Sequence, residues 1–402
     1  MTNQVTAGFL PLLDSAILVA AKVFGFAEEE GIELSLARET SWANIRDRMA
    51  IGHFDAAHML APMPIAANLG LTQMPVNLVA PMALGLGGNA VTVSKAIVAE
   101  MEEFGSLDGI KPAHNGALLA QVVRKRVEHG ENTLRFGVVH PHSGHNLELR
   151  YWLSACGIRP DVDVEIVVLP PPLMPDALSS GRVDAICVGE PWNSVAVDAG
   201  SGRIVTVKSA IWRSSPEKVL ALNAGCLDDN ADRTDRLLRA LYNAAQWCGL
   251  EENHQALAVA LSGADYLGHR PEIIGRALSG KLMLGGGEVV TIEDFFVPSA
   301  KAATFPWQSH ALWFYSQLVR WGMVDHTKKN IEIVIQSYRP DICRRALSPL
   351  NASLPSANAK VEGALTAPTP VGATSKTLIL GPDGFFDGKV FDPDQLEGYL
   401  GA

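Results

Sequence analysis

Long apolar runs, paired cysteine motifs and an excess of basic charge are all absent from this chain of 402 residues. No stretch contains the ~18 to 20 consecutive apolar residues of a membrane-spanning helix, which excludes a helical membrane protein. The 5 cysteines lie far apart without a CxxC pair, so we expect neither a disulfide framework nor a zinc site. The net charge of −10 argues against direct nucleic-acid binding, which normally needs a basic surface.

The N-terminal region also lacks the pattern of a secretory signal. Such a signal places basic residues before an apolar run, whereas the first basic residue here, Lys22, follows the apolar run 16–21. A helix explains that run better, because Asp14 or Ser15 can cap its start and Gly31 can end it. We therefore expect a cytoplasmic protein. The alternative is an exported protein whose leader has been removed.

Short apolar stretches alternate with helical patterns along the first part of the chain. Residues 5–9 and 33–37 have the pattern of strands, and helical patterns follow them from Ser15 and Trp42. This alternation, with 48% hydrophobic residues, predicts an α/β protein with a largely parallel sheet and helices on both faces. Ligands of such sheets bind beyond the carboxyl ends of the strands.

A second α/β unit follows the first, and the chain then returns. We predict lobe 1 from residues 1–90 plus 208–350, with a mainly helical C-terminal part, and lobe 2 from residues 91–207. The two crossings between these ranges leave a cleft, where small ligands usually bind. Residues 351–376 are rich in Ala, Pro, Ser and Thr without periodicity, which indicates a flexible linker. Residues 377–402 are predicted to dock on a lobe as a tail.

The segment 39–47 places an indole at the start of a predicted helix. Ser41 has the properties of an N-cap, and Trp42 would be the first helical residue. Free backbone N–H groups and the positive end of the helix dipole would then face whatever Trp42 faces, which suits an anion. The alternative is that Trp42 is an ordinary core residue.

Six short motifs occur in a fixed order along the chain. They are FLPLLD at 9–14, SWANIRD at 41–47, AHMLAPMP at 57–64, RYW at 150–152, GEPWN at 189–193 and PEKV at 216–219. Together they resemble the nitrate/bicarbonate-binding proteins of the NrtA/CmpA group, over about residues 4–345 with an echo at 385–393. The resemblance implies a two-lobed fold of the periplasmic-binding-protein kind (type II), with the ligand between the lobes. The missing leader fits the cytosolic branch of NasS-type nitrate/nitrite sensors.

The resemblance also implies an anion site. In the nitrate-binding members of the family the anion is held by an indole, a side-chain amide, an imidazole, a backbone N–H and a lysine. Carried over residue by residue, these groups belong to Trp42, Asn89, His145, Gly189 and Lys218. The family has Gln where this chain has Asn89, and the shorter amide reaches less far.

These residue types suit nitrate for physical reasons. Nitrate is a planar monoanion without a proton to donate, so its site needs donors and one compensating positive charge. The indole N–H of Trp42 and the ammonium of Lys218 only donate. Gly189 has no Cβ, so its N–H can approach closely, while Asn89 and His145 can turn a donor inward.

Each of these residues also has a structural explanation. Lys218 can be solvated beside Glu217, and Asn89 and Gly189 are common in turns. The three histidines of the loop 140–145 suggest a metal, but carboxylate or cysteine partners are lacking and the helical pattern would spread them apart. The functional reading is favoured because all five candidates follow strand or loop ends that face the same predicted cleft.

Lys218 separates ligands within the family. Bicarbonate-binding members carry a carboxylate at this position, with a bound calcium that offsets the charge. A lysine repels such a cation directly. We therefore expect nitrate or nitrite as the ligand, and neither a metal nor another cofactor.

The resemblance finally implies a role in regulation. A NasS-type sensor holds an ANTAR-type RNA-binding antiterminator and releases it when the anion binds, which controls nitrate-assimilation genes. The chain itself would contact neither nucleic acid nor membrane and would not be an enzyme. One alternative is the solute-binding subunit of a nitrate or bicarbonate ABC transporter without its leader. The other is an enzyme on this fold, for which Glu190 and His145 are the pair to examine.

Overall fold

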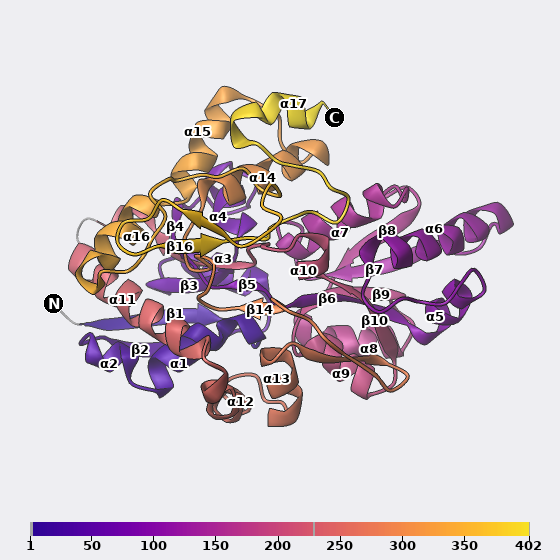
Figure 1. The fold of residues 1–402 in the computed structure, drawn as a ribbon, viewed down its shortest axis with the longest axis horizontal. Coiled ribbons are helices and arrows are strands. Elements are labelled where there is room, and N and C mark those ends of the chain that lie inside the picture. Colours follow the sequence, from indigo (N-terminus) through magenta and orange to yellow (C-terminus); the bar gives the residue numbers. More distant parts are fainter. Residues whose placement is uncertain (1–2, 228–229, 402) are drawn as a thin grey trace.

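Two five-stranded sheets, one in each half of the molecule, organise the fold (Figure 1). The computed structural model describes residues 3–227 and 230–401. Residues 1–2 and 228–229 of the predicted lobe 1 and residue 402 of the predicted tail lie outside the described residues. Among the described residues, no helix combines the length and the apolar character needed to cross a membrane.

The first sheet has the strand order β2-β1-β3-β11-β4. Its strands are β1 (Gln4–Phe9), β2 (Glu33–Arg38), β3 (Ala56–Leu60), β4 (Leu78–Ala83) and β11 (Lys218–Asn223). β1 runs parallel to β2 and β3, whereas β11 is antiparallel to both of its neighbours. Every residue of the central strand β3 is buried. The residues of β4 are buried as well, although β4 is an edge strand, because α4 (Pro62–Asn68), α15 (Lys328–Ser337) and α16 (Pro340–Leu347) pack against it.

The second sheet has the order β10-β6-β9-β7-β8. Its strands are β6 (Asn89–Ser94), β7 (Leu134–Val138), β8 (Val164–Val168), β9 (Ala185–Gly189) and β10 (Gly202–Val207). β7 is parallel to β8 and β9, and β6 is antiparallel to β9 and β10. Each sheet is therefore mixed, with parallel and antiparallel pairings, where a largely parallel sheet was predicted. In the first sheet the antiparallel strand β11 joins after the chain has passed through the second lobe.

The chain passes between the sheets twice. It leaves the first sheet after β4 and runs through β5 (Leu86–Gly87), which pairs with β14 (Phe296–Val297), into β6. It returns from β10 through α10 (Lys208–Ile211) to β11. The sequence placed these crossings near residues 90 and 208.

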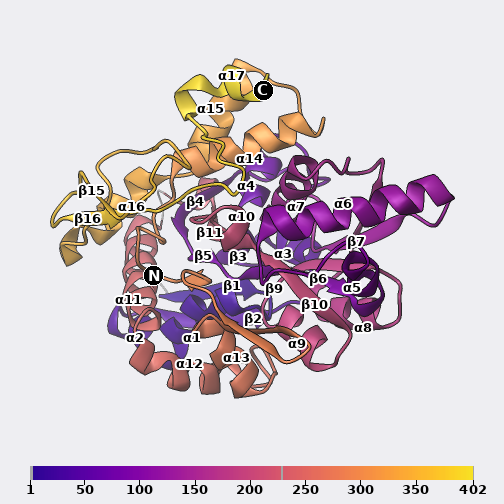
Figure 2. The same ribbon diagram turned by 45° about the vertical axis from the view of Figure 1, so that its right-hand side comes forward.

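Helices cover both sheets (Figure 2). Around the second sheet lie α5 (Lys95–Glu102), α6 (Pro112–His129), α7 (Gly144–Ala155), α8 (Met174–Ser179) and α9 (Trp192–Asp198). The first half of the molecule contains α1 (Ala16–Val23), α2 (Phe26–Glu29), α3 (Trp42–Ala50), α4 (Pro62–Asn68), α11 (Ala231–Cys248), α12 (His254–Leu261), α13 (Pro271–Leu278), α14 (Gln308–Arg320), α15 (Lys328–Ser337) and α16 (Pro340–Leu347).

A hairpin interrupts the mainly helical region and reaches the second lobe. It consists of β12 (Lys281–Gly285) and β13 (Glu288–Thr291), and it contacts α9 and β10. Arg203 of β10 pairs with Glu288 of the hairpin at 2.6 Å. The C-terminal part of the first lobe is therefore in direct contact with the second lobe outside the two crossings.

Residues 351–376 are packed, where a flexible linker was predicted. The guanidinium of Arg344 in α16 donates hydrogen bonds to the carbonyls of Pro355, Ser356 and Ala357. The short strand β15 (Thr369–Val371) then pairs with β16 (Leu378–Leu380). A neighbouring side chain thus satisfies part of the backbone of this segment, which is described throughout and contains no helix and only the short strand β15.

The C-terminal tail contacts both halves of the molecule (Figure 1). The ring of Phe385 stacks on Trp212 in the return crossing, with centroids 4.8 Å apart and planes 19° apart. The hydroxyl of Tyr151 in α7 donates to the Asp387 carboxylate at 2.8 Å. The final helix α17 (Leu396–Leu400) packs on α14 of the first half. The tail thus spans the return crossing.

Phe385→Ala should lower the free energy of unfolding by about 3 kcal/mol, because it leaves a cavity among buried aromatic rings. Denaturant unfolding of both proteins measures the difference. Val390→Ala in the same tail is the control, since Val390 is 47% exposed and its loss should cost under about 0.5 kcal/mol. Equal losses in the two variants would contradict the packing described for the tail.

Candidate functional site

Trp42 begins α3, as predicted. The Ser41 side chain accepts the Asn44 N–H at 3.2 Å, which confirms Ser41 as the N-cap. The Trp42 side chain is buried, and its Nε1 finds no hydrogen-bond partner among the described residues. A buried indole N–H usually has a partner, so this donor marks a place where a ligand can bind.

Lys218 begins β11 and is completely buried, so the solvated alternative is wrong. Its Nζ lies 2.6 Å from Asp14 Oδ2 and 2.7 Å from Glu217 Oε1. It also lies 5.4 Å from the ring centroid of Trp42. The positive charge that was predicted to compensate an anion is therefore already paired with two carboxylates.

Asp14 also contacts a histidine. His58 Nε2 lies 2.8 Å from Asp14 Oδ1, and the Leu10 N–H points at His58 Nδ1 from 3.5 Å. Burial by itself raises the pKa of Asp14, but Lys218 and His58 outweigh it and hold this pKa below its usual value. Burial lowers the pKa of His58. His58 is thus a neutral ring that we assign as protonated on Nε2, facing an ionised Asp14.

His145 lies in the first turn of α7, whose N-cap is Ser143. Its ring is fully buried, and Nδ1 is 3.1 Å from Glu217 Oε1. Nε2 has no partner in the part of the chain that the structure describes. Burial lowers the pKa of His145 to about 3, so the ring is neutral at physiological pH.

Glu217 connects His145 and Lys218 to a second ammonium group. Lys208 of α10 pairs with Glu217 and, at 2.9 Å, with Glu148 Oε1 of α7. Burial raises the pKa of Glu217, but His145, Lys208 and Lys218 together reverse this and lower it. Burial raises the pKa of Glu148 to about 7. Glu217 is therefore ionised and Glu148 is partly protonated near neutral pH.

Asn89 of β6 and Gly189 of β9 are paired residues on adjacent antiparallel strands of the second sheet. The Asn89 amide is buried, and neither its nitrogen nor its oxygen has a partner within residues 3–227 and 230–401. A Cβ on Gly189 would lie 2.9 Å from Asn89 Oδ1 and 3.1 Å from Leu12 Cδ2. Only glycine therefore lets this backbone approach the amide.

These contacts bring the five predicted residues together from both lobes. Trp42 and Lys218 come from the first sheet and its helices, whereas Asn89, His145 and Gly189 come from the second. A cavity of about 10 Å³, lined by both Asn89 and His145, adjoins the cluster. That volume holds about one water molecule. This cavity, lined by residues of the second lobe and of α10, is therefore too small for a polyatomic ligand.

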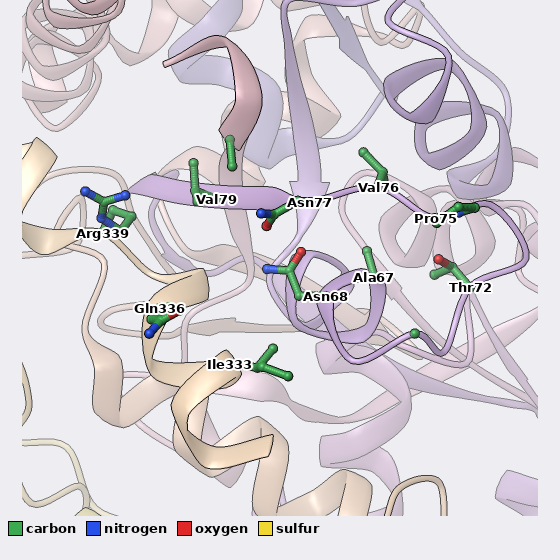
Figure 3. Close-up of a pocket in the computed structure, with 12 residues that line it drawn as sticks. Ala67, Asn68, Thr72, Pro75, Val76, Asn77, Val79, Ile333, Gln336 and Arg339 are labelled. Carbon is green, nitrogen blue, oxygen red and sulfur yellow. The ribbon is translucent and has the colours of Figure 1, made fainter. Parts of the chain in front are cut away.

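A larger pocket, of about 960 Å³, lies elsewhere on the first lobe (Figure 3). It is lined by residues of α4, α15 and β4, including Asn68, Val79 and Ile333. The Asn68 amide is already bonded to the backbone of Leu78 and to Ser337. None of the five predicted residues lines this pocket. This pocket is therefore separate from the buried cluster that unites the five predicted residues.

Residues 1–262 match the NMT1-like family. The nitrate/nitrite binding protein NrtA of Nostoc sp. is 30% identical over 411 residues, covering all of this chain and 86% of the relative. The chain belongs to the NMT1-like family. Within it, the chain is a member of the NrtA/CmpA group of binding proteins.

Two further relatives show how much of each chain the similarity covers. The crystal structure of the periplasmic nitrate-binding protein NrtA from Synechocystis superimposes with a TM-score of 0.87 at 26% identity, covering 100% of this chain and 98% of that one. This confirms the predicted two-lobed α/β fold of type II. The nitrate import ATP-binding protein NrtC of Synechocystis sp. is 35% identical over 83% of this chain, which spans 48% of NrtC.

The enzyme alternative is not supported. NrtA, which matches along most of its length, is a binding protein and not an enzyme. The suggested acid, Glu190, accepts the Ser194 N–H at 3.2 Å in the first turn of α9 and makes no contact with His145. The described residues contain no group of three or more His, Cys, Asp or Glu placed to hold a metal ion.

Sequence reasoning missed the charged residues behind the five candidates. These are Asp14, His58, Glu148, Lys208 and Glu217. Three of them stand inside motifs that were recognised, at 9–14, 57–64 and 216–219. Buried charges occur in pairs, so the PEKV motif on a buried strand was a signal that a partner for Glu217 had to exist.

Glu190→Gln should change how stability depends on pH. Burial raises the pKa of Glu190 from 4.5 to about 7, so the folded state binds more protons and the wild type loses stability as pH rises through this range. The variant lacks this loss. Its free energy of unfolding relative to the wild type should therefore increase by up to about 3 kcal/mol between pH 4 and pH 8. A difference that is constant over this range would contradict the assignment.

Proposed function

We propose that this protein binds nitrate or nitrite between its lobes. One observation carries the proposal. Buried polar groups without partners, Trp42 Nε1, the Asn89 amide and His145 Nε2, come from both lobes, and the buried ammonium of Lys218 lies close to Trp42 and His145. Unpaired buried polar groups cost free energy unless a ligand or water pairs with them. Two helix N-termini, those of α3 and α7, add a favourable field for an anion.

The chemistry of Lys218 favours nitrate or nitrite over bicarbonate with calcium. A cation beside the Lys218 ammonium would be repelled. The carboxylates nearest to it, Asp14 and Glu217, are both already paired with that ammonium. They are therefore poorly placed to serve as calcium ligands.

We further propose that the protein acts in the cytoplasm as a sensor of the NasS type. In this proposal it holds an ANTAR-type antiterminator, and anion binding shifts the lobes so that the partner is released to act on leader RNA. The motifs support the anion-binding part of this role, because they resemble the NrtA/CmpA group to which that branch is related. Ion pairs between the lobes, such as Arg276 with Asp198 at 2.8 Å, would respond to such a shift. A change from 1:99 to 99:1 needs ~5.5 kcal/mol of differential binding.

A transporter subunit is the second candidate, and the names of the relatives favour it. NrtC is a nitrate import protein, and NrtA from Synechocystis is periplasmic. The binding site would be the same in both roles. The two candidates differ in the partner, which would be an antiterminator in one case and a membrane permease in the other.

The Trp42→Phe variant tests whether nitrate binds at the indole of Trp42. The change keeps a ring but removes one N–H donor to a charged ligand, so nitrate affinity should fall about tenfold to a hundredfold. Isothermal titration calorimetry with sodium nitrate measures this. Trp321→Phe is a matched control, because Trp321 Nε1 is also buried without a hydrogen-bond partner among the described residues and lies at the end of α14. Equal affinity of the Trp42 variant and the wild type would remove Trp42 from the site.

Release of the antiterminator by nitrate tests the proposed sensor role. The purified protein is mixed with an ANTAR-type antiterminator from the same organism, and the complex is followed by size-exclusion chromatography with and without sodium nitrate. The sensor proposal predicts a complex that dissociates with nitrate in the wild type. The Trp42→Phe variant should need about tenfold to a hundredfold more nitrate for the same release. Nitrate binding without any complex would favour the transporter role.

A further inference from the structure

The charged cluster contains three carboxyl groups and two ammonium groups in contact. Lys218 lies between Asp14 and Glu217, and Lys208 lies between Glu217 and Glu148. With Glu148 protonated this cluster is neutral, and with Glu148 ionised it carries one negative charge. An anion placed beside it would add an uncompensated buried charge, which is expensive. Lys218 alone therefore cannot balance the ligand.

The orientation of His145 raises a second difficulty for an anion. A lone pair on Nδ1 would face the Glu217 carboxylate at 3.1 Å and be repelled, so the neutral ring carries its hydrogen on Nδ1. Nε2 then presents a lone pair. Neither ring nitrogen makes a hydrogen bond among residues 3–227 and 230–401, and of the two it is Nδ1 that lies beside a carboxylate. Nitrate only accepts hydrogen bonds. The neutral ring therefore offers the anion an acceptor instead of a donor.

We propose that the anion is bound together with one proton, which His145 takes up at Nε2. The inference rests on the proposed function, since it describes how that site takes its ligand. The proton comes from solvent, and no covalent bond other than N–H forms. It turns Nε2 into a donor and adds one positive charge next to Glu217 and Lys218. Both difficulties are thus resolved by the same event.

Other groups around His145 are less suited to take this proton. The titratable or charged groups that face the ring from neighbouring elements are Asp14, Cys187, Lys208, Glu217 and Lys218, and Glu148 lies on its own helix. His58 already uses Nε2 toward Asp14, and its Nδ1 faces the Leu10 N–H. A proton on Nδ1 would oppose that N–H. A proton on Glu148 would leave the Nε2 lone pair facing the anion.

The direction of the pH dependence follows. Burial lowers the pKa of the free His145 to about 3, so binding must raise this pKa in order to hold the proton. While the pH lies between the free and the bound pKa, the dissociation constant rises tenfold for each pH unit. Nitrate should therefore bind more weakly as the solution becomes more alkaline.

Calorimetric titration with sodium nitrate tests the proposal in two buffers of different ionisation enthalpy at the same pH. The wild type should take up close to one proton per anion bound, and its affinity should fall about tenfold between pH 6 and pH 7. His145→Gln keeps an amide donor without a titratable ring, so any binding it retains should be independent of pH and without proton uptake. His129→Gln, at an exposed position near the end of α6, should behave as the wild type.

The wild type also provides a readout that does not depend on a variant. Long-range ¹H–¹⁵N spectra should show the ring of His145 changing from one protonated nitrogen to two when sodium nitrate is added. Nitrate binding with no proton uptake and a flat pH profile would overturn the inference, as would proton uptake that persists in His145→Gln. No binding of nitrate or nitrite at any pH would instead contradict the proposed function.

Discussion

The buried carboxylate of Glu217 is the contact on which the interface between the lobes depends. It lies against Lys218 at the start of a strand of the first sheet, Lys208 in the return crossing and His145 on a helix of the second lobe. Each of these groups loses its hydration when the lobes meet, and only their mutual pairing offsets that loss. Removal of Glu217 or of either ammonium group would leave a buried charge uncompensated. The same pairing disfavours the binding of an anion, because the positive and negative charges of the cluster already balance each other.

This constraint links ligand binding to the position of the lobes. The adjoining cavity of about 10 Å³ is too small for a polyatomic ion. In the proposed function the anion therefore enters by a movement of the lobes. The connections between the lobes limit that movement. Besides the two crossings, the hairpin β12–β13 and the tail at Phe385 and Asp387 contact both halves. A ligand shifts the equilibrium between two arrangements of the lobes only by binding one of them more tightly than the other.

Much of the fold was accessible from the sequence, because strand and helix patterns are local. The alternation predicted the α/β class, and Ser41 and Trp42 have the predicted roles at the start of α3. The packing of residues 351–376 was not accessible, since it depends on Arg344 reaching their carbonyls. The charged network was missed for a similar reason. Asp14 and Lys218 are separated by 204 positions, and spacing along the chain does not reveal such a pair.

The most direct test of the account is a crystal structure of the protein grown with sodium nitrate. We predict one nitrate between the lobes, with its oxygens within hydrogen-bond distance of Trp42 Nε1, Asn89 Nδ2, His145 Nε2 and Lys218 Nζ. We also predict that Glu217 still contacts His145 Nδ1, as it does at 3.1 Å in the structure described here. A nitrate bound only at the surface would contradict the central claim. So would a structure grown at saturating nitrate that has no anion between the lobes.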